Sequence, residues 1–216
     1  MTPKINDTWK IVAAGPASVH ELRAFHYQNK SNVKSQIFRG SDYSSVKEMK
    51  AAFEKRAQEL NEQGYNIYTT LNPIRSDFKG KSAGDSDIDY RDLLLIDLDR
   101  TGDTKQPATD EDIQNSQALA DEVVKFLKKL KWPEPIKVMS GNGSHLYYIL
   151  DGIPNNEESK VLIKKTLKAL ANKFNNSDVS IDITVSNAGR ITKVPGTIMR
   201  KGEESEGRPY RVAKIL

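Results

Sequence analysis

The run at residues 93–99 constrains the fold of this chain more than any other feature of its sequence. Four consecutive large aliphatic residues open the run, and Asp97, Leu98 and Asp99 close it. An uninterrupted aliphatic run of this kind is typical of a central strand that is buried on both faces. Successive side chains of a strand point to opposite faces, so Asp97 and Asp99 share one face and lie about 6.6–7 Å apart.

These two carboxylates predict a site for a divalent cation. Like charges beside apolar packing are unfavourable unless a cation neutralises them. Oxygen ligands suit Mg²⁺ or Mn²⁺, which take the rest of their coordination from water and from the phosphates of a substrate. We therefore expect a metal at Asp97 and Asp99. The simpler alternative is that both side chains are solvated where the strand ends.

Composition limits the chemistry open to the chain. It has 216 residues, no cysteine and only three histidines, which excludes disulfides, thiolate zinc sites and a cysteine nucleophile. A metal must therefore rely on carboxylates, and zinc is not expected. The net charge of +4 permits a polyanionic partner without requiring one.

No targeting or membrane segment is evident in the sequence. It contains no apolar run near the roughly 20 residues that a membrane span needs, and its first residues lack the apolar core of a signal peptide. We therefore expect a cytoplasmic protein without a membrane partner.

Hydrophobic periodicity and turn residues divide the chain into helices and strands. Helices are predicted at residues 17–27, 45–64, 109–131 and 156–174. Strands are predicted at residues 8–14, 35–39, 66–71, 93–99, 136–140, 145–150, 179–185, 190–194 and 210–215.

The elements from residue 91 onward follow the order β-α-β-β-α-β, which is typical of a module like the RNA-recognition motif (RRM-like). The preceding region is a second unit of helices and strands. The expected fold class is therefore α+β, with an N-terminal α/β module at residues 1–90 packed against an RRM-like module at residues 91–216. A ligand is expected in the cleft between the two modules.

Asp182 adds a third carboxylate, on the predicted strand at residues 179–185, where apolar and polar residues alternate strictly. The first and third strands of a β-α-β-β-α-β unit lie centrally, so side chains from separate strands can meet on one face. Asp97, Asp99 and Asp182 could then hold two divalent ions about 3.5–4 Å apart, which serves in-line phosphoryl or nucleotidyl transfer.

Groups that could bind phosphate accompany the carboxylates. Residues 141–144 (Gly-Asn-Gly-Ser) expose backbone N–H groups at a turn, His145 follows directly, and Arg190 and Lys193 come after Asp182. Each has a simpler explanation, as an ordinary turn or a structural hydrogen-bond donor. Their joint order favours a phosphate site.

The order of these motifs resembles that of the archaeo-eukaryotic primase (AEP) superfamily, which carries D-x-D, small-x-His and hydrophobic-Asp motifs. Here the motifs and the segment that follows them are residues 97–99, 140–145, 181–182 and 190–197. The resemblance spans residues 91–197 and extends more loosely to residues 68–73. Within the superfamily the chain looks most like primase-polymerases of mobile elements and CRISPR-associated proteins.

The resemblance implies that both modules form one AEP catalytic domain. Such a domain performs nucleotidyl transfer from nucleoside triphosphates on a single-stranded DNA template and, in many members, de novo primer synthesis. By resemblance, Asp97, Asp99 and Asp182 would bind two Mg²⁺ or Mn²⁺ ions, and His145 would contact the incoming triphosphate. The further nucleotide-binding residues that it implies are Ser140, Asn142, Ser144, Arg190, Lys193, Asn72 and Arg75, the last two from the first module.

Two features depart from that pattern. Arg190 and Lys193 are three residues apart, so a regular strand would face them oppositely and only one would reach the nucleotide. The chain also lacks the zinc-binding insertion of some members, because it has no cysteine. An accessory or C-terminal domain beyond Leu216 would then be the partner that supplies such an element.

A haloacid-dehalogenase-type phosphatase is the main alternative. Residues 95–101 fit its D-x-D-x-T start, with Asp97 as a covalent nucleophile, and residues 138–140 resemble its hydroxyl motif. Asp178 and Asp182 have its D-x-x-x-D spacing. Two features oppose this interpretation: the chain continues into a strand after the hydroxyl motif, and Asp182 falls inside an alternating strand.

A non-catalytic, RRM-like nucleic-acid binder is a third possibility. It would need exposed aromatic side chains on its strands, and Tyr147 and Tyr148 could serve. That interpretation leaves the three aspartates unexplained.

Overall fold

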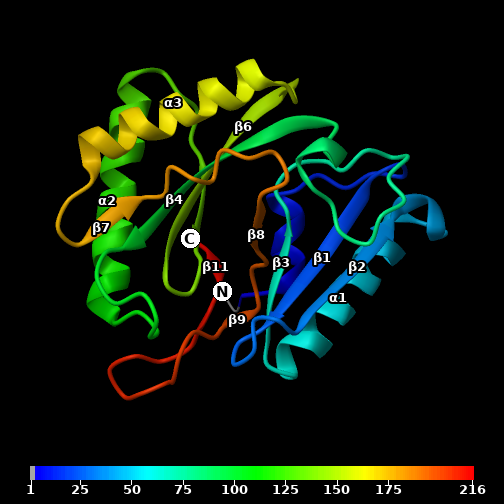
Figure 1. Cartoon of the computed structure of the whole chain (residues 1–216), viewed down its shortest axis with the longest axis horizontal. Helices are drawn as coiled ribbons and strands as arrows, with labels where there is room; N and C mark the ends of the chain where they lie inside the picture. Colours follow the sequence, from blue (N-terminus) through cyan, green and yellow to red (C-terminus); the bar gives the residue numbers. More distant parts are fainter. Residues whose placement is uncertain (1–2) are drawn as a thin grey trace.

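Two antiparallel β-sheets organise the chain, whose residues 3–216 are described by the computed structural model (Figure 1). Every pair of neighbouring strands runs antiparallel. Helices accompany both sheets, so the expected α+β class is confirmed.

The first sheet is built mainly from the N-terminal part of the chain. Its strands, in spatial order, are β2 (Val33–Arg39), β1 (Val19–His26), β3 (Tyr65–Thr70) and β8 (Ile191–Lys193). Helix α1 (Val46–Glu62) packs on it through buried Met49 and Phe53. The helix begins where Ser45 Oγ accepts a hydrogen bond from the Glu48 N–H, which satisfies an orphan donor of its first turn.

Strand β8 completes this first sheet, although residues 191–193 lie in the range expected for the second module. It pairs with β3, with Thr192 opposite Thr69. The chain therefore crosses back to the first sheet after it has built the second one. This crossing places the segment from Arg190 onward against both sheets.

Two N-terminal predictions were wrong. Residues 17–27 were predicted as a helix but contain strand β1. Residues 8–14 were predicted as a strand, but the first of them belong to the 3₁₀ helix η1 (Ile5–Lys10) and the others form no strand. Strand β1 is central and covered on both faces, because buried Glu21 is held by the segment around Ala83. A strand buried on both faces lacks the alternation that identifies a strand in sequence.

The second sheet has the predicted β-α-β-β-α-β core. Its strands, in spatial order, are β11 (Lys214–Ile215), β5 (Ile136–Met139), β6 (Gly143–Pro154), β4 (Tyr90–Arg100) and β7 (Val179–Ile181). Helices α2 (Asp110–Lys129) and α3 (Glu157–Phe174) cover one face. The first and third strands, β4 and β6, lie side by side, as expected.

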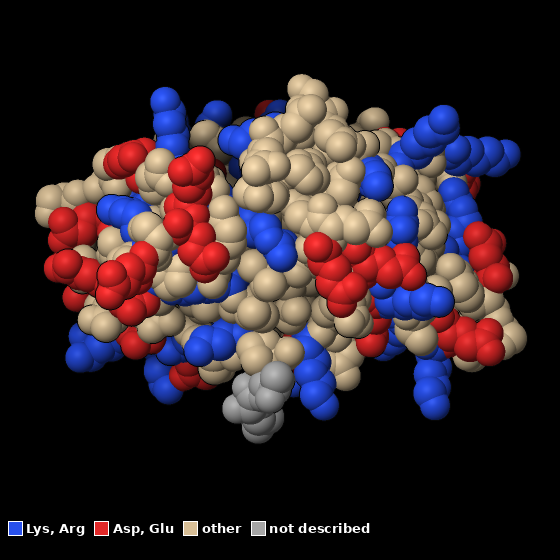
Figure 2. All heavy atoms as spheres, turned by 90° about the horizontal axis from the view of Figure 1, so that it is seen from below, with Lys and Arg blue, Asp and Glu red and all other residues tan. Residues whose placement is uncertain are grey.

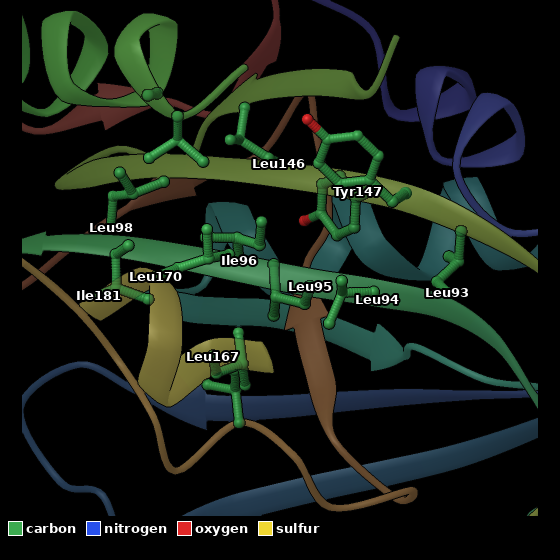
Figure 3. Close-up of a cluster of buried hydrophobic side chains, with 14 of the residues drawn as sticks. Leu93, Leu94, Leu95, Ile96, Leu98, Leu146, Tyr147, Leu167, Leu170 and Ile181 are labelled. Carbon is green, nitrogen blue, oxygen red and sulfur yellow. The ribbon is translucent and has the colours of Figure 1, made fainter. Parts of the chain in front are cut away.

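Strand β4 is the centre of the larger core (Figure 3). Its four leading aliphatic residues are at most 3% exposed, which confirms a strand buried on both faces. Ile96 and Leu98 pack with Leu167 and Leu170 of α3, on the face opposite Asp97. The packing of these side chains holds β4 rigidly and so fixes the position of its carboxylates.

A hairpin made of β9 (Ile198–Met199) and β10 (Arg211–Val212) connects the two sheets. On the side of the first sheet, the Asn66 amide bonds both the N–H and the C=O of Arg200, each at 2.7 Å. Asn61 does the same for Ile198. The side chains of Asn61 and Asn66 therefore make the backbone hydrogen bonds that a neighbouring strand would otherwise make with this part of the hairpin.

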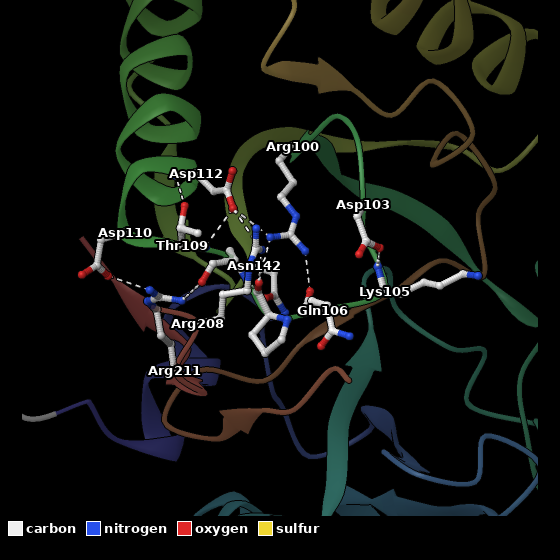
Figure 4. Close-up of polar contacts among 12 residues, drawn as sticks. Arg100, Asp103, Lys105, Gln106, Thr109, Asp110, Asp112, Asn142, Arg208 and Arg211 are labelled. Carbon is white, nitrogen blue, oxygen red and sulfur yellow. Dashed lines mark hydrogen bonds and ion pairs between the residues drawn. The ribbon is translucent and has the colours of Figure 1, made fainter. Parts of the chain in front are cut away.

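On the other side, the hairpin holds the loop that joins β4 to α2 (Figure 4). Arg211 pairs with Asp110 at 2.6 Å, and Arg208 donates to the carbonyl of Pro107 at 2.7 Å. Buried Arg100 bonds Asp112 at 2.8 Å. The hairpin, the loop and the start of α2 are thus one connected polar cluster.

Basic and acidic side chains are interspersed on the face that Figure 2 shows. Within residues 3–216, no helix combines the length and the apolar character that crossing a membrane requires.

Candidate active site

The three aspartates lie on neighbouring strands. Asp99 pairs with Ser180 across β4 and β7, and the Asp182 N–H donates to the Asp97 carbonyl at 2.9 Å. Residues that lie opposite each other in an antiparallel pair point to the same face, so Asp97 and Asp182 share the face of Asp99. This face is the one opposite α2 and α3.

Strand β7 ends earlier than the alternation predicts. It stops at Ile181, and Asp182 Oδ1 accepts a hydrogen bond from the Thr184 N–H at 2.7 Å. An aspartate that bonds its own backbone two residues on forms an Asx turn, which competes with strand pairing. The predicted strand at residues 179–185 is therefore too long, and Asp182 stands just past its end.

His145 lies on the opposite side of Asp97, across the β4–β6 pair. Its Nε2 is 3.3 Å from Asp97 Oδ1. Burial lowers the pKa of His145, but the adjacent Asp97 outweighs it and holds that pKa above its usual value. For Asp97 the directions are reversed. Burial raises the pKa of Asp97, but His145, with Arg190 and Lys201, outweighs burial and holds that pKa below its usual value. Each member of the pair therefore favours the charged form of the other.

The surroundings of Asp99 disfavour its ionised form. Burial and the charge of Asp97 raise the pKa of Asp99 to about 6. Asp97 Oδ1 is itself buried without a hydrogen-bond partner of good geometry among residues 3–216. A buried carboxylate oxygen without a well-aligned donor and a carboxylate disfavoured by its neighbours are both conditions that a bound cation relieves.

These residues fit Mg²⁺ or Mn²⁺. The donors are carboxylate oxygens, which such ions prefer, and the chain has no cysteine thiolate. In the described part of the chain, no group of three or more His, Asp or Glu side chains is close enough together to hold a metal ion. Two carboxylates, completed by water and substrate phosphates, form the site that the geometry supports. The set of three ligands for two ions stays a prediction.

The polar side chains at the start of β6 and in the loop before it bond to other parts of the protein. Ser144, on β6, points to the face opposite His145, where its Oγ lies 3.0 Å from Ser116 Oγ of α2. In the loop, Asn142 Oδ1 accepts from the Ala108 N–H, and Ser140 Oγ donates to the Gly143 carbonyl. These three predicted nucleotide contacts therefore have structural partners, and among them the Asn142 Nδ2 is buried without a partner within residues 3–216.

The two predicted contacts from the first module lie apart from each other. Asn72 is buried and fully engaged, since it donates to the Ala188 carbonyl and accepts from the N–H groups of Asp92 and Leu93. Arg75 lies on an exposed loop, where it pairs with Asp77 at 3.0 Å. Asn72 thus ties the first module to β4.

Arg190 and Lys193 have different surroundings. Arg190 Nη2 is 3.9 Å from Asp182 Oδ2, and its Nε is buried without a partner. Lys193 is only 2% exposed and donates to Thr197 Oγ1 at 2.6 Å. Burial, with the charge of Arg200, lowers the pKa of Lys193. Arg190 is therefore the cation of this pair that adjoins the carboxylates.

Several residues of the site were not predicted from sequence. Tyr147 Oη lies 2.8 Å from His145 Nδ1 and so fixes the imidazole. Burial and the charges of Asp97 and Asp99 raise the pKa of Tyr68. Burial lowers the pKa of Lys201, which lies in the loop of the hairpin, and the charges of Asp99 and Asp97 oppose that shift. Only the position of Tyr147, two residues after His145 on the same strand face, was a signal available in the sequence.

Tyr147 and Tyr148 are each 1% exposed. The proposal that they stack on bases as the exposed aromatic residues of an RRM-like binder is therefore wrong. Tyr147 is committed to His145, and Tyr148 packs against Trp132 in the core.

The fold is similar to those of a primase and of the polymerase domain of a DNA ligase. Primase RepB′ matches with a TM-score of 0.53 and 10% identity over 98% of this chain, which spans 54% of that structure. The polymerase domain of Mycobacterium tuberculosis ligase D, in complex with DNA, matches with a TM-score of 0.53 and 13% identity, over 96% of this chain and 78% of its own. No protein-family model and no curated protein matches the sequence.

Proposed function

We propose that this chain is a DNA primase-polymerase domain that joins nucleotides from nucleoside triphosphates on a single-stranded DNA template. The observation that carries the proposal is the placement of Asp97, Asp99 and Asp182 on one face of the second sheet, with His145 beside Asp97. The shared fold with primase and polymerase domains supports it. The DNA bound to the ligase D polymerase domain supports DNA as the partner.

Asp97 and Asp99 would hold the metal ions, with Asp182 as the third ligand of a two-ion site. When bound, such ions neutralise charge on the phosphate oxygens and lower the pKa of the attacking hydroxyl. Asp97 holds the pKa of His145 above its usual value, which favours the protonated imidazole that would donate to a phosphate oxygen. Arg190 offers a second cation beside Asp182.

The division into modules at residues 1–90 and 91–216 comes from the order of the predicted elements. The finer features that come from the sequence resemblance are de novo primer synthesis and a relationship to primase-polymerases of mobile elements and CRISPR-associated proteins. Zinc has no part in the proposed mechanism.

One observation opposes the phosphatase alternative. The chain after Ser140 forms strand β6 and not a helix, as expected from the sequence. The second sequence argument against it was wrong, because Asp182 lies after β7 and not inside a strand. Turnover of an aryl phosphate that beryllofluoride inhibits would support the phosphatase.

The test is polymerisation by the purified chain with single-stranded template, nucleoside triphosphates and Mn²⁺ or Mg²⁺. We expect oligonucleotide products, lost on removal of the metal by EDTA. Asp97→Asn keeps the side-chain shape but removes a metal-binding charge, so we expect activity to fall by at least about a hundredfold.

Asp178→Asn is the matched control, because Asp178 lies on an exposed turn just before β7. Its activity should stay within about twofold of wild type. Full activity of Asp97→Asn, or polymerisation in excess EDTA, would show that the proposed function is wrong.

A further inference from the structure

The loop between β7 and β8, residues 182–190, carries two groups of the candidate active site. We call it the return loop, because it leads the chain from the second sheet back to the first (Figure 1). Asp182 is its first residue and Arg190 is its last. Arg190 Nη2 donates to Thr184 Oγ1 at 3.2 Å, and the Thr184 N–H donates to Asp182 Oδ1 at 2.7 Å. The placement of both groups therefore depends on the conformation of this loop.

The return loop contains no helix or strand, so its backbone depends on partners from outside the loop. Three of its backbone carbonyls accept hydrogen bonds from residues at the end of β3 and the start of β4. The donors are Leu71, Asn72 and Arg91, at 2.8–2.9 Å. A loop without regular secondary structure must find acceptors for its N–H groups as well.

Asp85 supplies such an acceptor from the loop that joins β3 to β4, residues 71–89, which we call the β3–β4 loop. Asp85 Oδ1 accepts hydrogen bonds from the Gly189 N–H at 2.8 Å and from Asn187 Nδ2 at 3.2 Å. These are the only hydrogen bonds of the Asp85 side chain within residues 3–216. A carboxylate oxygen has two lone pairs, so this one atom can hold both donors of the return loop.

The two loops are also in close contact around this hydrogen bond. A Cβ at Gly189 would lie 2.8 Å from the carbonyl carbon of Gly84 and 3.0 Å from the Asp85 nitrogen, so the two backbones touch. Ala188 is fully buried and packs in one apolar cluster with Ile88. Asp85 therefore bonds the return loop inside a packed contact between segments 104 residues apart in sequence.

The β3–β4 loop is itself anchored on both sides of Asp85. On the first sheet, Glu21 accepts from the Ala83 N–H and Arg23 donates to the Ala83 carbonyl, each at 2.9 Å. From the second sheet, Asn155 Nδ2 donates to the Asp85 carbonyl at 2.9 Å. These bonds limit the movement of Asp85, so it can serve as a fixed support for the return loop.

We propose that Asp85 is a positioning residue of the candidate active site. Its carboxylate holds the return loop in the conformation that keeps Asp182 and Arg190 next to each other, at 3.9 Å, beside Asp97. Asp85 touches no reacting group, since its side chain bonds only the return loop. The inference rests on the proposed function, in which Asp182 is a metal ligand and Arg190 is a cation for phosphate.

The test compares Asp85→Ala with Asp85→Asn. Asp85 is exposed, so both variants should fold, and urea unfolding checks that they do. The amide oxygen of asparagine also has two lone pairs and can accept both hydrogen bonds, whereas alanine can accept neither. Asp85→Asn should therefore retain the function of Asp85, and Asp85→Ala should lose it.

Primer extension at saturating metal measures the difference. A displaced return loop misplaces groups that act on the phosphate in the transition state, so kcat of Asp85→Ala should fall roughly 10- to 100-fold. The KM for nucleotide should change by less than about threefold, because uniform binding of the nucleotide is retained. Asp85→Asn should stay within about threefold of wild type in both constants.

Asp89→Ala is the matched control. Asp89 is an exposed aspartate of the same loop, and its N–H bonds the Pro73 carbonyl and not the return loop. Its kcat should stay within about twofold of wild type. A wild-type kcat in Asp85→Ala would overturn the inference. An equal loss in Asp85→Asn would overturn it as well, because the charge of residue 85, and not its hydrogen bonds, would then matter.

Hydrogen exchange separates this inference from the proposed function, because it needs no turnover. The amides of residues 182–190 should exchange about tenfold faster in Asp85→Ala than in wild type, and at nearly the wild-type rate in Asp85→Asn. Unchanged exchange in Asp85→Ala would overturn the positioning role. Absence of primer extension by wild type would count against the proposed function alone.

Discussion

Tyr147 Oη lies 2.6 Å from Thr192 Oγ1, and this contact joins the sheet that carries the aspartates to strand β8 of the other sheet. The same hydroxyl lies 2.8 Å from His145 Nδ1. One buried tyrosine therefore links the first sheet to the imidazole that faces Asp97. Its hydroxyl has both a structural and a positioning role.

Tyr147→Phe should destabilise the fold by about 1–3 kcal/mol, because it leaves buried partners on both sides without their hydrogen bond. Urea unfolding at neutral pH measures this change. The matched control is Tyr148→Phe, since the Tyr148 hydroxyl is buried without a partner among residues 3–216. That variant should be neutral or more stable, and equal losses in both variants would contradict the assigned contacts.

His20 should make stability depend on pH. Burial, with the charge of Lys50, lowers the pKa of His20 from 6.5 to about 4. The unfolded chain therefore binds a proton between pH 6.5 and 4 that the folded chain does not, so stability falls as pH decreases through this window. The loss should total about 3 kcal/mol and level off below pH 4.

His20→Phe is the comparison for that measurement. The free energy of unfolding of wild type and variant is measured from pH 7 to pH 4. The difference between the two should change with pH by the amount that His20 contributes. A His20 ring that titrates above pH 6 in the folded protein, as followed by NMR, would contradict the prediction.

Glu21 should hold the segment around Ala83 against the first sheet. Its side chain is fully buried, pairs with Arg23 at 2.7 Å and accepts from the Ala83 N–H at 2.9 Å. Glu21→Ala leaves a largely buried guanidinium without its partner, so we expect a loss of about 3 kcal/mol. Trypsin should then cleave faster at Lys79 and Lys81.

Glu59→Ala provides the control, because Glu59 pairs with Arg56 on the exposed surface of α1. A surface pair of this kind contributes about 0–1 kcal/mol, so neither stability nor cleavage should change much. Equal protection of the Lys79 and Lys81 sites in Glu21→Ala and wild type would contradict the anchoring role.

Gly141→Ala should destabilise the protein by about 3 kcal/mol or more, because two effects add. Its φ of +109° is a backbone conformation that disfavours side chains, and a Cβ would collide with Met199 of the hairpin. Gly102 has a φ of +78° but open space around it, so Gly102→Ala should cost only about 1 kcal/mol. Thermal unfolding distinguishes the two, and similar shifts in melting temperature would contradict the close contact.

The sequence by itself determined the parts of this protein that depend on local patterns. The aliphatic run before Asp97 defined the central strand, and hydrophobic periodicity defined three helices, whose N-caps in the structure are Ser45, Thr109 and Asn156. Such signals act between residues a few positions apart, so they are readable without a structure.

Tertiary structure decided everything that depends on contacts distant in sequence. Strand β1 was missed because a loop some 60 residues away buries its polar face. Ser144 was assigned to the nucleotide, although strand alternation turns it toward Ser116. The charges of Asp99 and Asp97 act on Lys201 only because Asn61 and Asn66 hold the hairpin in place. The sequence pattern indicates on which face of a strand or helix a side chain lies, but only tertiary packing decides which residues contact that face.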